Sequence, residues 1–157
     1  MTEKYYLTKK GLEKAKKEYA SLLEFKKLKT KGEVPAIWES EDVNPDYLAF
    51  QEDMSLLETR LAEYENILKN VELIVPPPSG KRSIVSLGAT VTLEIDDGQI
   101  DEFEIVGTLE SNPMMGKISN ESPVGSAFLG HHVGDEVVVS SPTKTTYRIK
   151  KIRYTSP

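Results

Sequence analysis

A short acidic run holds the side chains best suited to chemistry in this 157-residue chain. It reads Glu39, Ser40, Glu41 and Asp42, and Asp46 follows shortly after it. Carboxylates grouped in this way can meet a metal ion or a basic surface. Because segments with helical spacing lie on both sides of the run, we expect a charged tip that a long arm carries to a distant site.

The elements that would position this tip are two long helices. After the run, eight apolar side chains step by three and four residues, which places them on one stripe of a helix, as in a coiled-coil seam. They are Tyr47, Phe50, Met54, Leu57, Leu61, Tyr64, Leu68 and Val71. Asn44 suits the N-cap and Pro45 the first turn, so the pattern predicts a helix over 45–74.

A matching stripe precedes the run over residues 8–29, where Thr8 is a good N-cap. Its apolar positions are Leu12, Ala15, Tyr19 and Leu22. Two such helices predict an antiparallel coiled-coil hairpin that buries both stripes. Gly32 and Pro35 interrupt the first helix, so we expect it to bend or unwind over 30–35 and to resume over 36–39.

The second half of the chain has the alternation that is typical of strands. It follows a stiff spacer at Pro76–Gly80, and the Asp96–Gly98 segment is a strong hairpin-turn signal. Predicted strands cover 90–95, 103–106, 136–139 and 147–152, and a short helix opens at Ser122–Pro123 and closes at Gly130. We therefore expect a hairpin over 1–75, a linker over 76–82 and an α+β domain with an antiparallel sheet over 83–157.

Composition narrows the class of protein. The chain has no cysteine, which excludes a disulfide framework and a thiolate metal site. No apolar run approaches the roughly 20 residues that span a bilayer, and the first residues lack the pattern of a secretory signal. We therefore expect a cytoplasmic protein with no membrane partner. The adjacent His131 and His132 point apart on most backbones, so we expect no metal there.

The net charge of −5 hides a strong asymmetry between the two predicted helices. Residues 8–31 hold nine lysines against three glutamates, whereas residues 39–65 hold nine acids against one arginine. The densest basic cluster is Lys26, Lys27, Lys29 and Lys31. These lysines can pair with acids on the other helix, or they can meet the phosphates of a nucleic acid. The sequence leaves both interpretations open.

Several segments, taken in order, resemble the Gre factors, the bacterial elongation factors that stimulate transcript cleavage. The segments are Tyr6–Lys14, Asn44–Tyr47, Leu87–Val91, Glu104–Gly107, Ser122–Gly125, Leu129–Gly130 and Gly134–Val137. The resemblance covers nearly the whole chain. It implies a C-terminal FKBP-like domain that binds RNA polymerase at the rim of its secondary channel, and a helical hairpin that reaches down this channel.

The resemblance also implies a mechanism and roles for residues. Tip carboxylates would help hold a catalytic Mg²⁺ that is shared with the polymerase. The polymerase would cut its own backtracked RNA, so the factor would not itself be an enzyme. It would act as a monomer. The leading tip acids are Glu41 and Asp42, with Glu39 and Asp46 as second choices. The lysine cluster would contact the 3′ end of the nascent RNA. The polymerase-facing residues would be Ser122, Pro123, Val124, Phe128 and Leu129, although Phe128 and Leu129 suit the core of the sheet equally well.

The tip departs from the family pattern, which reads Gly-Asp-Leu-x-Glu-Asn. Aligned on Asn44, the family aspartate falls on Ser40 and the family glutamate on Val43. A shifted loop could bring Glu41 and Asp42 to the working position. The alternative is a Gre-like inhibitor or regulator that occupies the channel without stimulating cleavage. Two further alternatives are a prolyl isomerase, suggested by the implied fold alone, and a passive coiled-coil adaptor.

Overall fold

The structure is a computed structural model that describes residues 3–32, 35–39, 42–96, 98–140 and 143–154, with the backbone alone at 38–39 and 42–43. It contains two compact units. Residues 12–70 form the hairpin unit, and residues 1–11 together with 71–157 form the sheet unit. The domain boundaries expected near residues 75 and 83 stay a prediction.

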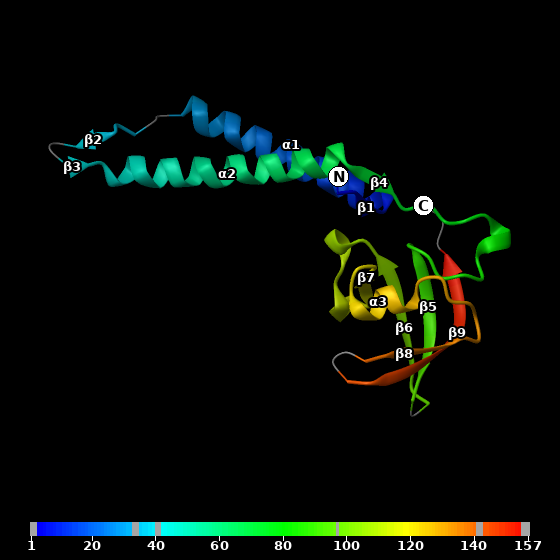
Figure 1. Ribbon diagram of the computed structural model, residues 1–157. Coiled ribbons are helices and arrows are strands. Elements are labelled where there is room, and N and C mark those ends of the chain that lie inside the picture. The colour runs from blue at the N-terminus through cyan, green and yellow to red at the C-terminus, as the bar shows by residue number, and fades with distance from the viewer. Residues whose placement is uncertain (1–2, 33–34, 40–41, 97, 141–142, 155–157) are drawn as a thin grey trace. The chain divides into compact units, whose positions relative to one another are not determined.

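Two long helices make up most of the hairpin unit (Figure 1). Helix α1 (Lys9–Lys31) begins in the sheet unit, and α2 (Pro45–Lys69) follows the tip. Both predicted N-caps are confirmed. The Thr8 hydroxyl accepts a hydrogen bond from the Gly11 N–H at 3.0 Å, and Asn44 Oδ1 accepts one from the Asp46 N–H at 3.0 Å. These bonds satisfy N–H groups that a helix start leaves unpaired.

The two helices run antiparallel and bury their apolar stripes. The Tyr19 hydroxyl, near the start of α1, donates to Glu65 Oε1, near the end of α2, at 2.8 Å. Leu57 and Leu61 are each 5 % exposed, and the other predicted stripe positions of α2 are half-buried. The predicted period therefore identified the buried faces of both helices correctly. Within the described part of the chain, no helix has the length and apolar character to cross a membrane.

The connection between the helices is a short ribbon and not a resumed helix. Strand β2 (Trp38–Glu39) pairs antiparallel with β3 (Asp42–Val43), so the helix predicted over 36–39 is wrong. The Asn44 N–H donates to the Ile37 carbonyl at 2.9 Å and closes the ribbon against the start of α2. Cross-strand pairing thus takes over where Pro35 prevents the helix from continuing.

A second correction concerns the end of α2. The helix stops at Lys69, five residues before the predicted end, and residues Val71–Leu73 form β4. This strand pairs in parallel with β1 (Tyr5–Leu7), whose Leu7 is buried. The Asn70 N–H turns back to the Asn66 and Ile67 carbonyls at 3.2 Å, which satisfies the helix end.

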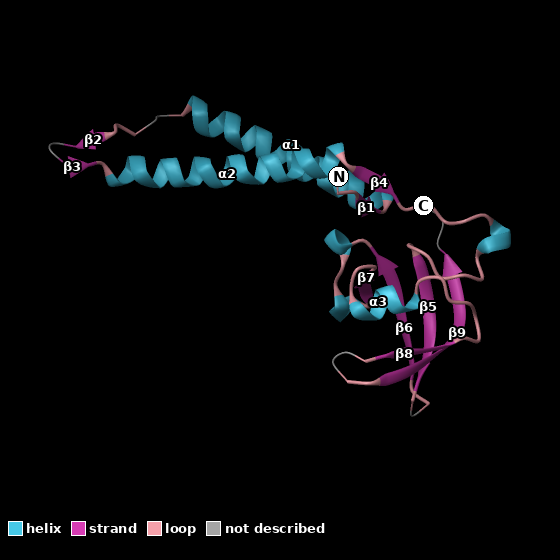
Figure 2. Ribbon diagram, viewed as in Figure 1, coloured by secondary structure: helices cyan, strands magenta, loops and turns pink. Residues whose placement is uncertain are grey.

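The sheet unit is built on five strands in the order β7-β6-β5-β9-β8 (Figure 2). Their bounds are β5 (Ala89–Ile95), β6 (Ile100–Val106), β7 (Lys117–Ser119), β8 (Glu136–Val139) and β9 (Thr145–Tyr154). Three of the four pairings are antiparallel, but β6 and β7 are parallel. The sheet is therefore mixed, which corrects the antiparallel sheet expected from the sequence.

Among its described residues, the sheet unit also contains helix α3 (Pro123–Phe128) and three single turns of 3₁₀ helix. The turns are η1 (Ser79–Lys81), η2 (Thr108–Glu110) and η3 (Pro113–Met115). Helix α3 (Pro123–Phe128) starts where predicted, since the Ser122 hydroxyl accepts a hydrogen bond from the Gly125 N–H at 3.0 Å. Gly130, with φ of +84°, ends this helical segment in the left-handed conformation that glycine adopts easily.

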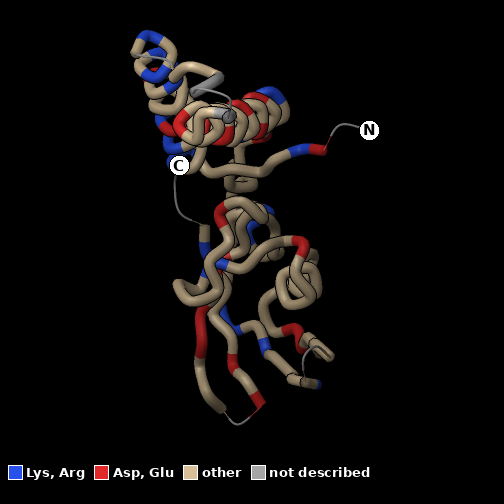
Figure 3. The backbone as a smooth tube through the Cα atoms, turned by 90° about the vertical axis from the view of Figure 1, so that its left-hand side faces the viewer, with Lys and Arg blue, Asp and Glu red and all other residues tan. Residues whose placement is uncertain are grey.

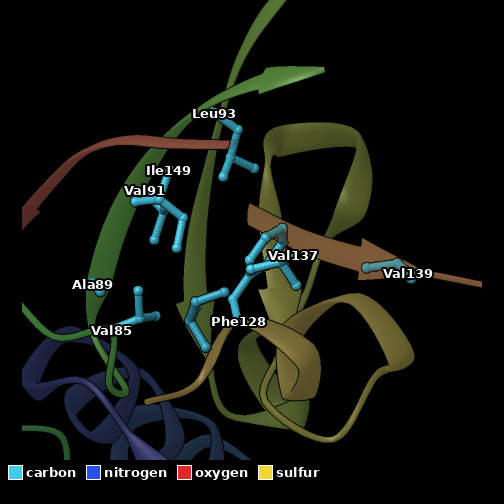
Figure 4. Packing of buried hydrophobic residues seen from close by; sticks show 9 residues of the cluster. Val85, Ala89, Val91, Leu93, Phe128, Val137, Val139 and Ile149 are labelled. Carbon is cyan, nitrogen blue, oxygen red and sulfur yellow. The ribbon is translucent and has the colours of Figure 1, made fainter. Parts of the chain in front are cut away.

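The core of the sheet unit lies between the strands and α3 (Figure 4). Phe128 is the largest fully buried side chain, and its ring packs edge-on against Tyr147 with 5.4 Å between ring centroids. Around it lie Val85, Ala89, Val91, Leu93, Ile105, Val137, Val139 and Ile149. Burying α3 through Phe128 fixes the position of the loop that precedes this helix.

Candidate functional site

The backbone of the tip brings two of the predicted acidic residues together. In the β2–β3 ribbon, Glu39 is the register partner of Asp42. Directly opposed residues of an antiparallel pair are close neighbours. Asp46 is exposed in the first turn of α2, where a carboxylate is favourable because of the helix dipole. Glu41 lies outside the described residues, as do the side chains of Glu39 and Asp42.

The tip acids carry carboxylate oxygens, which are the ligands that a hard cation such as Mg²⁺ prefers. Among the described residues, no group of three or more His, Cys, Asp or Glu side chains could hold a metal ion.

The predicted lysine cluster divides into two pairs of different character. Lys29 Nζ lies 2.8 Å from Asp53 Oδ2 and 5.6 Å from the centre of the Phe25 ring, and its side chain is 22 % exposed. Lys26 Nζ lies 3.8 Å from Glu58 Oε1. Both lysines therefore join α1 to the acidic helix α2. Lys27 and Lys31 are exposed.

The charges of the hairpin unit follow this division. Figure 3 shows both charges on each helix, and the sequence places most of the lysines on α1 and most of the acids on α2. Opposite charges on neighbouring helices attract each other only weakly at exposed positions, by about 0–1 kcal/mol for a pair. The pairing explains the asymmetry only in part, because exposed lysines remain on α1.

The predicted polymerase-facing residues fall into a buried part and an accessible part. Phe128 is 0 % exposed and belongs to the core, whereas Leu129 packs against the core and is half-buried, so a docking role for these two residues stays a prediction. Pro123 is exposed, while Ser122 and Val124 are half-buried. The first turn of α3 is therefore the accessible part of this segment.

Close packing at Gly125 holds that first turn in place. A Cβ atom at this position would collide with the Ser119 carbonyl oxygen at the end of β7. The Ser122 hydroxyl also donates to the same carbonyl at 2.7 Å while it caps α3. The loop from β7 into α3 is consequently determined by backbone contacts, which only glycine permits at this distance.

Exposed apolar side chains near α3 were not anticipated from the sequence. Met114 is 97 % exposed, and Met115 and Leu109 are also exposed. They lie on η2 and η3, and both of these turns contact β7, as α3 does. The Pro113-Met114-Met115 sequence is the signal that could have indicated them, because two methionines in a loop have no core to fill.

The two adjacent histidines contact one aspartate. Asp135 Oδ2 accepts a hydrogen bond from the His132 N–H at 2.8 Å and lies 3.2 Å from Nδ1 of His131. The pKa of the Asp135 carboxyl is lowered, mainly by the hydrogen bond from the His132 backbone and next by the hydrogen bond with the His131 ring. The group closes the turn into β8, which gives the histidines a structural role.

Comparison with known proteins gives sequence matches that run through both units. A family model described as transcription elongation factor, GreA/GreB, C-term, matches residues 80–154. Transcription elongation factor GreA of Thermomicrobium roseum is 41% identical over 145 residues, which cover 91% of this chain and 92% of that protein. Transcription elongation factor GreA of Clostridium acetobutylicum is 38% identical over 145 residues, covering 89% and 90%.

Solved structures give a weaker comparison. The crystal structure of GreA factor homolog 1 of Thermus thermophilus is 27% identical and covers 96% of this chain and 99% of that chain, with a TM-score of 0.43. The assignment to a family therefore depends on the sequence matches and not on this superposition.

Proposed function

The chain belongs to the GreA/GreB family of transcription elongation factors, and from this premise we propose that it binds RNA polymerase and stimulates cleavage of backtracked RNA. It would do so as a cytoplasmic monomer, through the nuclease activity of the polymerase itself. The observation that carries the proposal is the placement of acidic residues at the far end of an antiparallel helix pair in a member of this family.

In this proposal the tip acids are the residues that affect the chemistry. Glu41 and Asp42 are the leading pair, with Glu39 and Asp46 as second choices. The opposed register positions of Glu39 and Asp42 support a carboxylate group at the end of the ribbon. The Mg²⁺ shared with the polymerase would stabilise an in-line displacement at phosphorus. The contribution of the tip would be to supply oxygen ligands and to orient water.

The sheet unit would supply affinity for the polymerase, through an FKBP-like domain. Ser122, Pro123 and Val124 are the proposed contact residues, and the exposed Met114, on a turn that contacts β7 as α3 does, would add apolar area to this surface. Flexible methionine side chains adapt well to a partner surface.

The lysine cluster would have two separate roles. Lys27 and Lys31 are exposed and would attract the phosphates of the RNA 3′ segment. Lys26 and Lys29 would keep the two helices together through their acidic partners. The proposal therefore assigns RNA contact first to the exposed pair.

An inhibitory function is the second candidate, and the tip sequence favours it. Ser40 and Val43 stand where the family has its acidic pair, and neither side chain is a carboxylate. A hairpin that enters the channel without these ligands would block nucleotide entry without assisting cleavage.

Cleavage of RNA in a purified backtracked elongation complex of the cognate polymerase distinguishes the two candidates at fixed Mg²⁺. We expect the protein to accelerate release of short 3′ fragments, and we expect Glu41→Ala with Asp42→Ala to abolish this effect while polymerase binding is kept. Slower nucleotide addition without faster cleavage would support the inhibitor. A double variant that no longer binds would show that the assigned roles are wrong.

A further inference from the structure

A carboxylate far away in the sequence contacts the beginning of the first helix. Glu110 Oε1 accepts a hydrogen bond from the Thr8 N–H at 2.6 Å, and its Oε2 accepts one from the Thr8 hydroxyl at 2.8 Å. The two residues are 102 positions apart, and both are half-buried in the sheet unit. Two oxygens of one carboxylate therefore hold the residue that caps α1.

The same contact continues into the helix. The Thr8 hydroxyl donates to Glu110 and accepts from the Gly11 N–H at 3.0 Å, so it connects the carboxylate with the first turn. A Cβ atom at Gly11 would come within 2.5 Å of Glu110 Oε1. The carboxylate occupies space that any larger residue at position 11 would take.

Elementary physics explains why this arrangement is stable. The first turn of a helix has unpaired N–H groups and a partial positive charge, and both favour an anion. Hydrogen bonds to an ionised carboxylate are stronger than those between neutral groups. A capping residue with its own charged acceptor is held in position more firmly than a threonine alone.

We propose that Glu110 is a positioning residue, which anchors the start of α1 to the sheet unit so that the tip acts effectively when the sheet unit is bound. Helix α1 is continuous from Lys9 to Lys31 and leads toward the acidic run, so its first turn is the base of the arm. The inference rests on the proposed function, because it assigns binding to the sheet unit and the effect on transcription to the tip.

The test uses the full-length protein and the backtracked complex, and it measures two quantities. The first is the RNA cleavage rate at saturating factor, and the second is the factor concentration that gives half of this maximal rate. Misplacement of a group by about 1 Å can cost about a hundredfold in rate. We expect Glu110→Ala to lower the maximal cleavage rate tenfold or more, and to change the half-saturating concentration less than twofold. If the protein is an inhibitor, the measured quantity is instead the maximal slowing of nucleotide addition by the polymerase.

Gly11→Ala is a second variant that displaces the carboxylate without removing a charge. Alanine favours the helix more than glycine, so the substitution does not weaken α1 itself. We expect Gly11→Ala to lower the maximal cleavage rate as Glu110→Ala does. Thr8→Val should lower this rate as well, whereas Thr8→Ser, which keeps the hydroxyl, should retain most of it. Glu136→Ala, which removes an exposed partner of Arg148 in the same unit, is the matched control and should behave as wild type.

Hydrogen exchange in the free protein tests the anchor independently of transcription. Amides in the first turn of α1 should exchange faster in Glu110→Ala and Gly11→Ala than in wild type, while amides of β5 stay protected. Unchanged exchange together with an unchanged maximal effect would overturn the inference. If wild type has no effect on transcription at all, the proposed function fails, and the exchange result still decides whether Glu110 anchors the helix.

Discussion

Truncation of Phe128 to alanine separates a core role from a docking role for the segment around α3. The ring is 0 % exposed, packs edge-on against Tyr147, and lies among apolar side chains of the sheet (Figure 4). The substitution removes the largest fully buried side chain of the unit. The change therefore acts on stability first, and on any partner only through stability.

The expected magnitude follows from the lost packing. Removing a buried phenylalanine side chain costs about 3–5 kcal/mol, because the surroundings close the cavity only partly. A domain of this size loses about 4–8 °C in Tm for each kcal/mol, so the Tm should fall by about 12–40 °C. Typical domains are stable by about 5–15 kcal/mol, so the loss takes a large part of the total and the folded fraction at 25 °C is measured before binding is compared.

Thermal and urea unfolding of the full chain measures this loss, and polymerase binding is measured in parallel at 25 °C. Phe128→Leu should lose less than Phe128→Ala, and Val138→Ala, at an exposed position of β8, should be close to wild type. A Phe128→Ala protein with unchanged Tm but lost polymerase binding would refute the reasoning, because it would make Phe128 a contact residue.

Three further predictions concern other parts of the molecule. Gly125→Ala should lower both the Tm of the sheet unit and its affinity for polymerase, because the new Cβ collides with a carbonyl at the end of β7; melting and binding of one preparation check this. Asp135→Asn should destabilise the protein at pH 7, and urea unfolding should show the deficit narrowing below about pH 4. The reason is that the His132 N–H bond depresses the folded pKa of Asp135, so its stabilisation is present above the unfolded pKa and is lost as pH falls through the folded value. Lys27→Gln should reduce RNA crosslinking in the elongation complex more than Lys29→Gln does. Lys29→Gln should instead lower the stability of the helix pair by about 0–1 kcal/mol, because it removes the partner of Asp53. Equal losses of crosslinking in the two variants would contradict the assigned roles.

The helix pair could be predicted from the sequence because its signals are local. Apolar steps of three and four residues set the buried stripes, and the caps at Thr8 and Asn44 need only near neighbours. The same is true of the turn between β5 and β6, where the Gly98 N–H donates to the Ile95 carbonyl at 2.7 Å, and of the cap at Ser122. Each of these features was confirmed.

The errors share a physical cause, which is backbone pairing between strands that the spacing of apolar residues does not reveal. Val71–Leu73 continues the helical spacing, but it pairs with Tyr5–Leu7, and this parallel partner is invisible to local analysis. The three-residue strand Lys117–Ser119 is similarly defined by its parallel neighbour β6. The ribbon at Trp38–Glu39 forms because Asp42–Val43 lies opposite it.

The candidate site was only partly predictable for the same reason. The acidic run is visible as composition, whereas the pairing of Lys29 with Asp53 depends on how the two helices are aligned. Burial of Phe128 depends on where α3 meets the sheet. The contact of Glu110 with Thr8 spans 102 positions, and no local signal indicates it.

The dependence of RNA cleavage on Mg²⁺ concentration tests the central claim most directly. The backtracked complex is titrated with Mg²⁺ alone, with saturating wild-type protein, and with the Glu41→Ala, Asp42→Ala double variant. If tip carboxylates help hold the shared ion, wild type lowers the Mg²⁺ concentration needed for half-maximal cleavage, and the bound double variant returns it to the value without factor. An unchanged Mg²⁺ requirement with wild type bound would contradict the claim that the tip supplies ligands to the metal.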